Sequence, residues 1–106
     1  MSPVSTLNLE LAQDETYQGE DWWRWSVRVE GDPESLDQIA RVVYQLHPTF
    51  PQPVREVTDR ETNFAVKSEG WGTFVIHARV ELQDGRSQKL SHELQLTYPD
   101  GTVTLA

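Results

Sequence analysis

The sequence has 106 residues, enough for one domain with a single modest core and too few for two. Its formal net charge is −8, from nine Lys and Arg against seventeen Asp and Glu, which argues against direct binding to the phosphate backbone of a nucleic acid. The absence of cysteine excludes a disulfide framework and a thiolate metal site.

The chain is expected to be one cytoplasmic domain over residues 1–106. No apolar run approaches the roughly 18 residues that span a bilayer, and no basic segment followed by an apolar stretch opens the sequence. The hydrophobic fraction of 37% includes many Val, Leu, Ile and Trp residues, which favours a folded domain over disorder.

Period-2 alternation of apolar and polar residues predicts most of the chain as strands. The first strand is predicted at 7–11 and the second at 22–30. One face of the second strand carries Trp23, Trp25, Val27 and Val29. Turn chemistry at Gly31-Asp32-Pro33 ends it. For 34–40 we favour a short loop over a helical turn, because the residues that follow favour a strand at 40–47.

The second half continues the pattern. Three prolines exclude helix and central strand across 48–54. The clearest alternation runs over 74–82, and the hairpin turn Asp84-Gly85 leads into a returning strand. One face of that strand carries Leu90, His92, Leu94, Leu96 and Tyr98. A last short strand is predicted at 102–105. Seven or so short strands predict an all-β fold, an antiparallel sandwich of immunoglobulin type.

Two segments stand out between the strands. Leu46-His47-Pro48-Thr49-Phe50-Pro51 and Gly70-Trp71-Gly72-Thr73-Phe74 each place an aromatic residue beside a small or hydroxylated one. If both segments are turns at one end of the sandwich, Phe50 and Trp71 can face each other across a slot. Parallel rings about 7 Å apart would leave room for one flat group such as an amide.

These segments and the strands around them resemble the YEATS domain, a reader of acylated lysine. The resemblance runs from about Trp25 to Leu96. It includes Val42 to Phe50, Glu69 to Phe74, and the stretch Leu90-Ser91-His92-Glu93-Leu94-Gln95-Leu96. Both motifs occur in the family's order and spacing, on the strand pattern of its fold.

The resemblance implies a set of ligand-binding residues. Phe50 and Trp71 would sandwich the acyl-amide, the Thr49 hydroxyl would hydrogen-bond it, and the Trp71 backbone N–H would meet the acyl oxygen. His47 would orient the Thr49 loop. Gly70, Gly72 and Thr73 belong to the glycine-rich turn along which acyl chains pass, and Phe74 is either an inner pocket wall or plain core. Trp22 is the expected extra wall, and Trp25 matches the family's core tryptophan.

The sequence also departs from the family. Glu61-Thr62-Asn63-Phe64 stands where the family usually has a Pro-Pro-aromatic run, so the loop shape is expected to differ. His92 is expected to be a hydrogen-bonded core histidine. The three histidines are too far apart for a metal site, and the sequence has no nucleophile–base pair. We therefore expect neither metal, cofactor nor enzymatic activity.

The function predicted is a non-enzymatic binding module for acetyl-lysine, crotonyl-lysine or a similar flat amide. Its partner would be an acylated protein or peptide. Unmodified lysine would be rejected because its ammonium finds no carboxylate in the slot. The first alternative is a scaffold that docks a partner protein or neighbouring effector domain, with Phe50 and Trp71 plugging one end. A second is a glycan-binding module that stacks sugars on Trp22 and Trp71.

Overall fold

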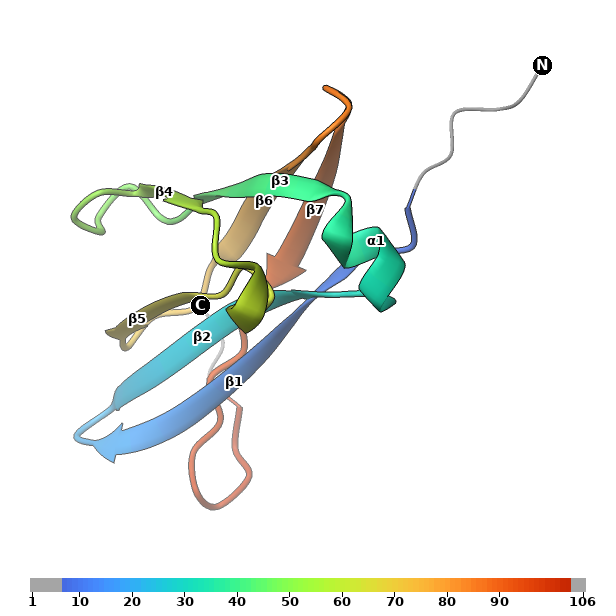
Figure 1. Cartoon of the computed structure of the whole chain (residues 1–106). Helices are drawn as coiled ribbons and strands as arrows, with labels where there is room; N and C mark the ends of the chain where they lie inside the picture. Colours follow the sequence, from blue (N-terminus) through green and yellow to red (C-terminus); the bar gives the residue numbers. More distant parts are fainter. Residues whose placement is uncertain (1–6, 104–106) are drawn as a thin grey trace.

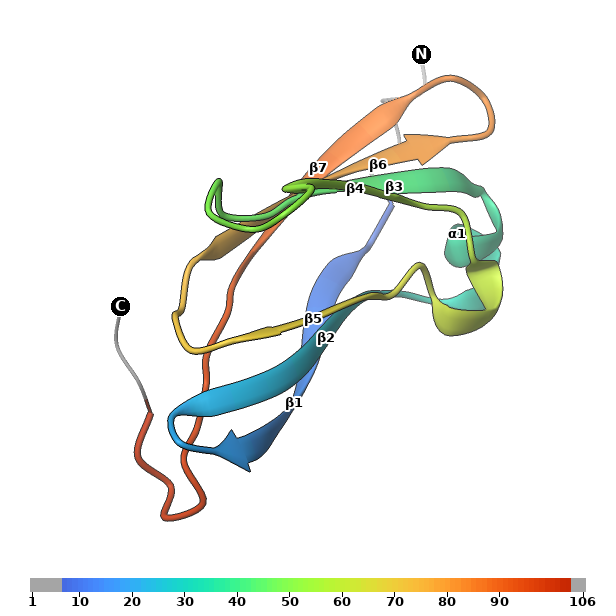
Figure 2. The same ribbon diagram turned by 90° about the vertical axis from the view of Figure 1, so that its left-hand side faces the viewer.

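The computed structural model describes residues 7–103 and has two antiparallel sheets packed face to face (Figures 1 and 2). The elements in chain order are β1 (Glu10–Gly19), β2 (Trp22–Glu30), α1 (Pro33–Asp37), β3 (Ile39–Gln45), β4 (Val54–Val57), η1 (Arg60–Thr62), β5 (Val66–Gly70), β6 (Val75–Leu82) and β7 (Ser87–Glu93). One sheet has the order β1-β2-β5 and the other β4-β3-β6-β7. The predicted all-β sandwich is confirmed.

The core lies between the sheets and follows the predicted alternation. All four apolar residues on the inner face of β2 are buried, with Trp23 fully enclosed. They pack against the inner faces of β3 and β6, which supply Val42, Tyr44, Ile76, Ala78, Val80 and Leu82. The alternation is therefore enough to assign which face of β2 and β6 turns inward.

Polar side chains close the side of the sandwich where β1 meets the chain after β7. The Gln13 Oε1 atom accepts hydrogen bonds from the Gln95 N–H at 3.0 Å and from His92 Nε2 at 2.6 Å. The Gln13 Nε2 group donates to the Gln95 carbonyl at 2.6 Å. His92 thus has the partner predicted for it, although it is only half-buried, and this burial lowers its pKa.

The loop preferred for 34–40 is wrong, because a short helix, α1, fills most of that stretch. Its N-cap is Asp32, whose side chain accepts the Ser35 N–H at 2.7 Å, and Pro33 occupies the first turn. Asp-Pro was interpreted as a turn that only ends a strand, whereas an acidic cap followed by proline also starts a helix. Among residues 7–103, no helix has the length and apolar character needed to cross a bilayer.

Several strand boundaries also differ from the prediction. β1 begins later than 7–11 and extends to Gly19, β3 ends before residues 46–47, and β7 ends at Glu93 rather than near Tyr98. The alternation missed the continuation of β1 because Gln13 takes an inward-facing place through hydrogen bonds. β4 and β5 were not predicted individually. The last strand is reduced to one bridge, Thr97 to Val103, and residues 104–105 lie outside the described range.

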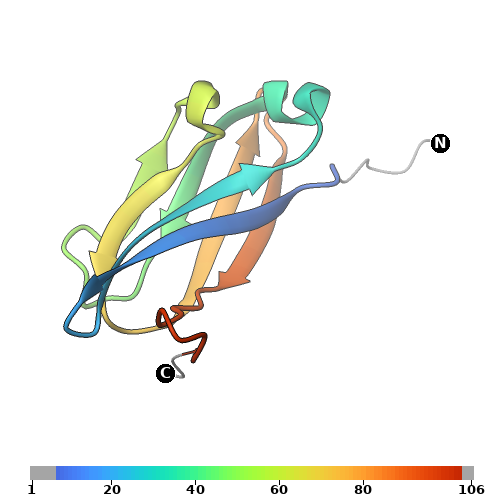
Figure 3. The same ribbon diagram turned by 90° about the horizontal axis from the view of Figure 1, so that it is seen from below.

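The elements divide between the two ends of the sandwich. Figure 3 shows α1 and η1 at one end, and at the other the β1–β2 turn, the loop after β3 and the loop between β5 and β6. The two motifs singled out in the sequence therefore lie at the same end. The hairpin after β7 lies at this end as well.

The segment with Asn63 and Phe64 has an unusual backbone. Both residues have positive φ, 59° and 58°, and Phe64 turns its ring into the core with 1% exposure. The Tyr44 hydroxyl, itself buried, donates to the Phe64 carbonyl at 2.6 Å. Burial raises the pKa of the Tyr44 phenol, so the group stays a neutral donor.

We therefore predict that Tyr44→Phe lowers the free energy of unfolding by about 1–3 kcal/mol, since the buried Phe64 carbonyl loses its partner. Denaturant melts measure the change. Thr58→Val is the control, because it removes a hydroxyl from an exposed position, and a change under about 0.5 kcal/mol is expected. Equal effects in the two variants would contradict this account.

Candidate functional site

A cavity of about 910 Å³ opens at the loop end of the sandwich. It lies between the loop after β3, the β5–β6 loop and the β1–β2 turn. All nine residues predicted to bind ligand line it: Trp22, His47, Thr49, Phe50, Gly70, Trp71, Gly72, Thr73 and Phe74. The fold thus brings two segments some twenty residues apart, and one tryptophan from β2, around a single space.

Sequence reasoning missed five further lining residues: Glu20, Asp21, Pro51, Glu69 and Tyr98. The acidic ones were interpreted as solvent-facing, and Tyr98 as part of a strand face. The expectation that the cavity holds no carboxylate is therefore wrong. The sequence held one signal for Glu20 and Asp21, because they directly precede Trp22, which was predicted as a wall of the cavity.

Two aromatic rings, Phe50 and Phe74, form the floor of the cavity, and both pack against the Trp25 ring, which is not itself among the lining residues. Phe50 contacts Trp25 edge-on with ring centroids 6.1 Å apart, and Phe74 contacts the same indole at 6.0 Å. Phe50 and Phe74 also contact each other at 5.2 Å. The tip of the Phe50 ring lies beside Gly70, where an added Cβ would be 3.8 Å from Cζ. The two loops are thus joined through Trp25, a core residue of β2.

The Trp25 indole N–H has no hydrogen-bond partner within residues 7–103, although it is buried. Leaving such a donor unpaired costs about 1–3 kcal/mol. The same ring makes edge-to-face contacts with both Phe50 and Phe74. The sequence left open whether Phe74 is a pocket wall or part of the core. In the structure it lines the cavity and also packs against the core.

Trp71 lies differently from the floor residues. Its side chain is 70% exposed, and within the described range no ring contact joins it to Phe50. Two rings in mutual contact would have plugged this end of the sandwich. Instead, Phe50 packs against Trp25 and Phe74, while the Trp71 side chain lies largely in solvent at the opening.

The His47 and Thr49 side chains form a pair on the loop after β3. His47 Nδ1 lies 2.8 Å from Thr49 Oγ1 and accepts the Thr49 backbone N–H at 3.2 Å. Accepting that N–H requires an unprotonated Nδ1, so the hydroxyl proton also points to this nitrogen. The lone pairs of Oγ1 then remain open to accept a hydrogen bond from a ligand.

The β1–β2 turn supplies the wall formed by Glu20 and Asp21. Both residues have positive φ, 53° and 58°, which non-glycine residues seldom adopt. Two tyrosines hold this turn: the Tyr17 hydroxyl accepts the Asp21 N–H at 3.1 Å, and the Tyr98 hydroxyl donates to the Asp21 carboxylate at 2.7 Å. This hydrogen bond raises the pKa of Tyr98.

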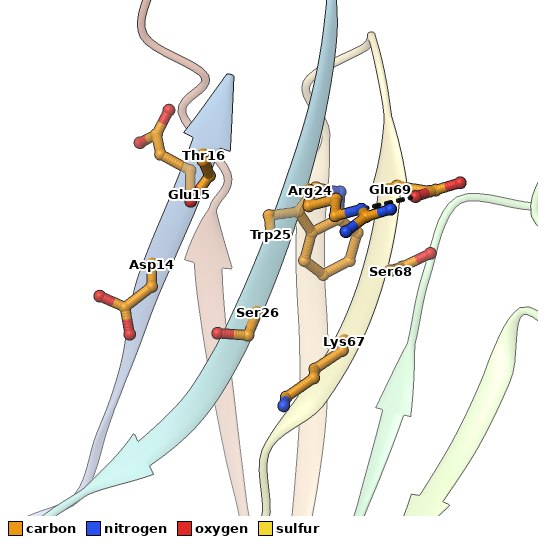
Figure 4. Close-up of a pocket in the computed structure, with 9 residues that line it drawn as sticks. All are labelled: Asp14, Glu15, Thr16, Arg24, Trp25, Ser26, Lys67, Ser68 and Glu69. Carbon is orange, nitrogen blue, oxygen red and sulfur yellow. Dashed lines mark ion pairs between the residues drawn. The ribbon is translucent and has the colours of Figure 1, made fainter. Parts of the chain in front are cut away.

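A second concavity, of about 430 Å³, lies over the β1-β2-β5 sheet (Figure 4). Polar side chains dominate its lining, and Arg24 pairs with Glu69 across it at 3.4 Å. Trp25, 3% exposed, is its one apolar lining residue. Such a surface is typical of the solvated face of an antiparallel sheet. The loop-end cavity, with its aromatic floor, is the stronger candidate for a ligand site.

A family model described as the prokaryotic YEATS domain matches residues 23–95. The chain belongs to this family. The match includes both loop motifs and all of the predicted site residues except Trp22. The resemblance to a YEATS domain is thereby confirmed.

Curated relatives of this YEATS domain come from yeasts and related fungi. It is 32% identical over 76 residues to "Transcription initiation factor TFIID subunit 14" of Schizosaccharomyces pombe, and 36% identical over 78 residues to "Protein AF-9 homolog" of Eremothecium gossypii. The matches cover 66% and 68% of this chain but 31% and 36% of those proteins. The chain thus spans about a third of their length.

Solved YEATS structures share the fold. The Yaf9 YEATS domain recognizing an H3K122suc peptide superposes with a TM-score of 0.65 at 21% identity, covering 98% of this chain and 84% of that one. The Yaf9 YEATS domain bound to H3K27ac gives the same TM-score and coverage at 22% identity. At this identity the likeness establishes the immunoglobulin-like sandwich and nothing about ligands.

The different settings of Phe50 and Trp71 generate a prediction about stability. Phe50→Ala should lower the free energy of unfolding by about 1.5–3 kcal/mol, part of the cost at a fully buried phenylalanine, because the ring packs on Trp25 and Phe74. Trp71→Ala should change it by less than about 0.5 kcal/mol, because the side chain is largely in water. Thermal and denaturant melts of both variants provide the comparison. If Trp71→Ala proved the more destabilising, this description of the floor would be wrong.

Proposed function

We propose that this YEATS domain is a non-enzymatic reader that binds the side chain of an acylated lysine in the loop-end cavity. The observation that carries the proposal is the meeting of the His47–Thr49–Phe50 and Gly70–Phe74 segments around one aromatic-floored space. The solved Yaf9 structures with H3K122suc and H3K27ac support it by kinship.

Each polar and aromatic group has a role in this proposal. Thr49 Oγ1 accepts a hydrogen bond from the amide N–H of the acyl-lysine. Its lone pairs are free for this because the Thr49 hydroxyl donates its own hydrogen bond to His47 Nδ1. Trp71, exposed at the opening, covers the flat amide from the side opposite Phe50. The Trp71 backbone N–H donates to the acyl oxygen, as the family resemblance implies. The exposure of Trp71 leaves the opening of the cavity accessible to a ligand.

Discrimination against unmodified lysine rests on the loop after β3 and the β5–β6 loop rather than on the whole cavity. The lining carboxylates come from the β1–β2 turn and the end of β5, and the two motif loops contribute none. An ammonium group placed beside Phe50 and Thr49 would lose much of its hydration while gaining one hydroxyl acceptor. An amide at the same place keeps both of its hydrogen bonds.

Thr49→Val tests the hydroxyl at nearly constant volume. It should weaken binding of an acetyl-lysine or crotonyl-lysine peptide by about 0.5–1.5 kcal/mol, the net contribution of a neutral hydrogen bond. Calorimetric titration measures the change. The matched control is Thr58→Val, an exposed threonine outside the cavity, which should bind like the unchanged protein. Full affinity in Thr49→Val would remove Thr49 from the site.

The two aromatic faces generate a further prediction on acyl selectivity. A crotonyl group is planar and conjugated and can stack on Phe50 and Trp71, whereas butyryl has sp³ carbons that cannot lie flat. The crotonyl peptide should bind more tightly by about 0.5–1 kcal/mol, the scale of the stacking contribution. Parallel titration of the two peptides measures the difference. Equal affinity would refute stacking, and no binding of either peptide would favour a scaffold with a vestigial pocket.

A further inference from the structure

The wall of the cavity formed by the β1–β2 turn and the end of β5 is negatively charged. Glu20, Asp21 and Glu69 line the cavity, and among residues 7–103 no lysine or arginine does so. The whole chain has a formal charge of −8, so no positive surplus elsewhere offsets this wall. The formal charge that this wall presents to the cavity is therefore negative.

The three carboxylates are not equally neutralised. Glu69 has an ion pair with Arg24 at 3.4 Å, although both side chains are more than half exposed, which weakens the pair. Within residues 7–103, neither Glu20 nor Asp21 has an ion-pair partner. The Tyr98 hydroxyl that donates to Asp21 is a neutral group, so it fixes the carboxylate without cancelling its charge.

The turn that carries these charges is held in place. The Asp21 backbone is tied to the Tyr17 hydroxyl and its carboxylate to Tyr98, and these two rings contact each other at 5.5 Å. Both rings also pack on the buried Trp23. A ligand that meets the Asp21 carboxylate therefore cannot easily displace it.

We propose that this wall restricts the cavity to uncharged acyl groups, so that lysine modified with a carboxylate-ended acyl group such as succinyl is excluded, in contrast to the Yaf9 YEATS domain, which recognizes an H3K122suc peptide. The inference rests on the proposed function and specifies its ligand class. An anionic group reaching the β1–β2 turn would approach Glu20 and Asp21 without a cation to pair with. Neutral acyl groups of the same length meet no such penalty, and a terminal amide could donate a hydrogen bond to the wall.

The test compares two peptides of identical sequence whose lysine carries either succinyl or its monoamide. The two acyl groups have the same length and differ by one charge. We expect the amide form to bind at least tenfold more tightly. Because charge repulsion is screened by salt, the ratio should fall when ionic strength rises from about 0.05 M to about 0.5 M. A crotonyl-lysine peptide is titrated alongside.

A double variant, Glu20→Gln with Asp21→Asn, removes two charges and keeps the shape of the wall. Asparagine tolerates the positive φ at position 21, and its amide oxygen can still accept from Tyr98. The preference for the amide form should shrink at least threefold in this variant. Glu10→Gln with Glu34→Gln removes two exposed charges outside the cavity and should leave the preference unchanged.

The outcomes separate this inference from the proposed function. Equal affinity for the two succinic forms alongside crotonyl binding would overturn the inference and leave the function standing. If the crotonyl peptide binds and both the succinyl and the monoamide peptides are rejected, the length of the acyl group and not its charge limits binding. This result would also overturn the inference. A preference that survives the double variant and high salt would show that charge is not its cause. If no acyl-lysine peptide binds, the proposed function and the inference both fail.

Discussion

The contact of Trp25 with Phe50 and Phe74 is the interaction on which the site depends. Trp25 belongs to the core by the alternation of β2, yet its ring makes edge-to-face contacts with aromatic residues from two different loops, at centroid distances of 6.1 and 6.0 Å. Phe50 and Phe74 therefore take their positions from the sandwich rather than from their own loops. The floor of the cavity is therefore packed directly against the core. Trp71 is 70% exposed and lies largely in water at the opening.

The opposite wall is built by a different means. A two-residue turn with positive φ at Glu20 and Asp21 favours glycine or asparagine, and here the tyrosine hydrogen bonds offset the strain. Backbone strain of this kind is often found at functional sites. The hairpin after β7 brings Tyr98 to the turn, so the segment that follows β7 takes part in shaping the cavity. Floor and wall together give the cavity an aromatic side and an acidic side.

Much of this could be predicted from the sequence, for reasons that lie in particular residues. The inward face of β2 and the strand at 75–82 followed from alternation, and the two loop motifs were recognised by their aromatic and glycine residues. β1 beyond residue 11 could not be predicted, because Gln13 replaces an apolar inward residue and is satisfied by the distant Gln95 and His92. The acidic wall was missed for a similar reason. Its carboxylates lie around the same cavity only in the folded chain, where the β1–β2 turn is close to the end of β5 and to Tyr98.

The central claim is that an acyl-lysine occupies the cavity between Phe50 and Trp71, and amide-resolved NMR titration tests it most directly. On adding an acetyl-lysine peptide, the account predicts that the largest shift changes fall on the amides of Thr49 and of residues 70–74 and on the Trp71 indole. The outer face of the β1-β2-β5 sheet, around Ser26 and Lys67, should change little. Largest changes on that outer face, or none anywhere with the acylated peptide in excess, would contradict the account.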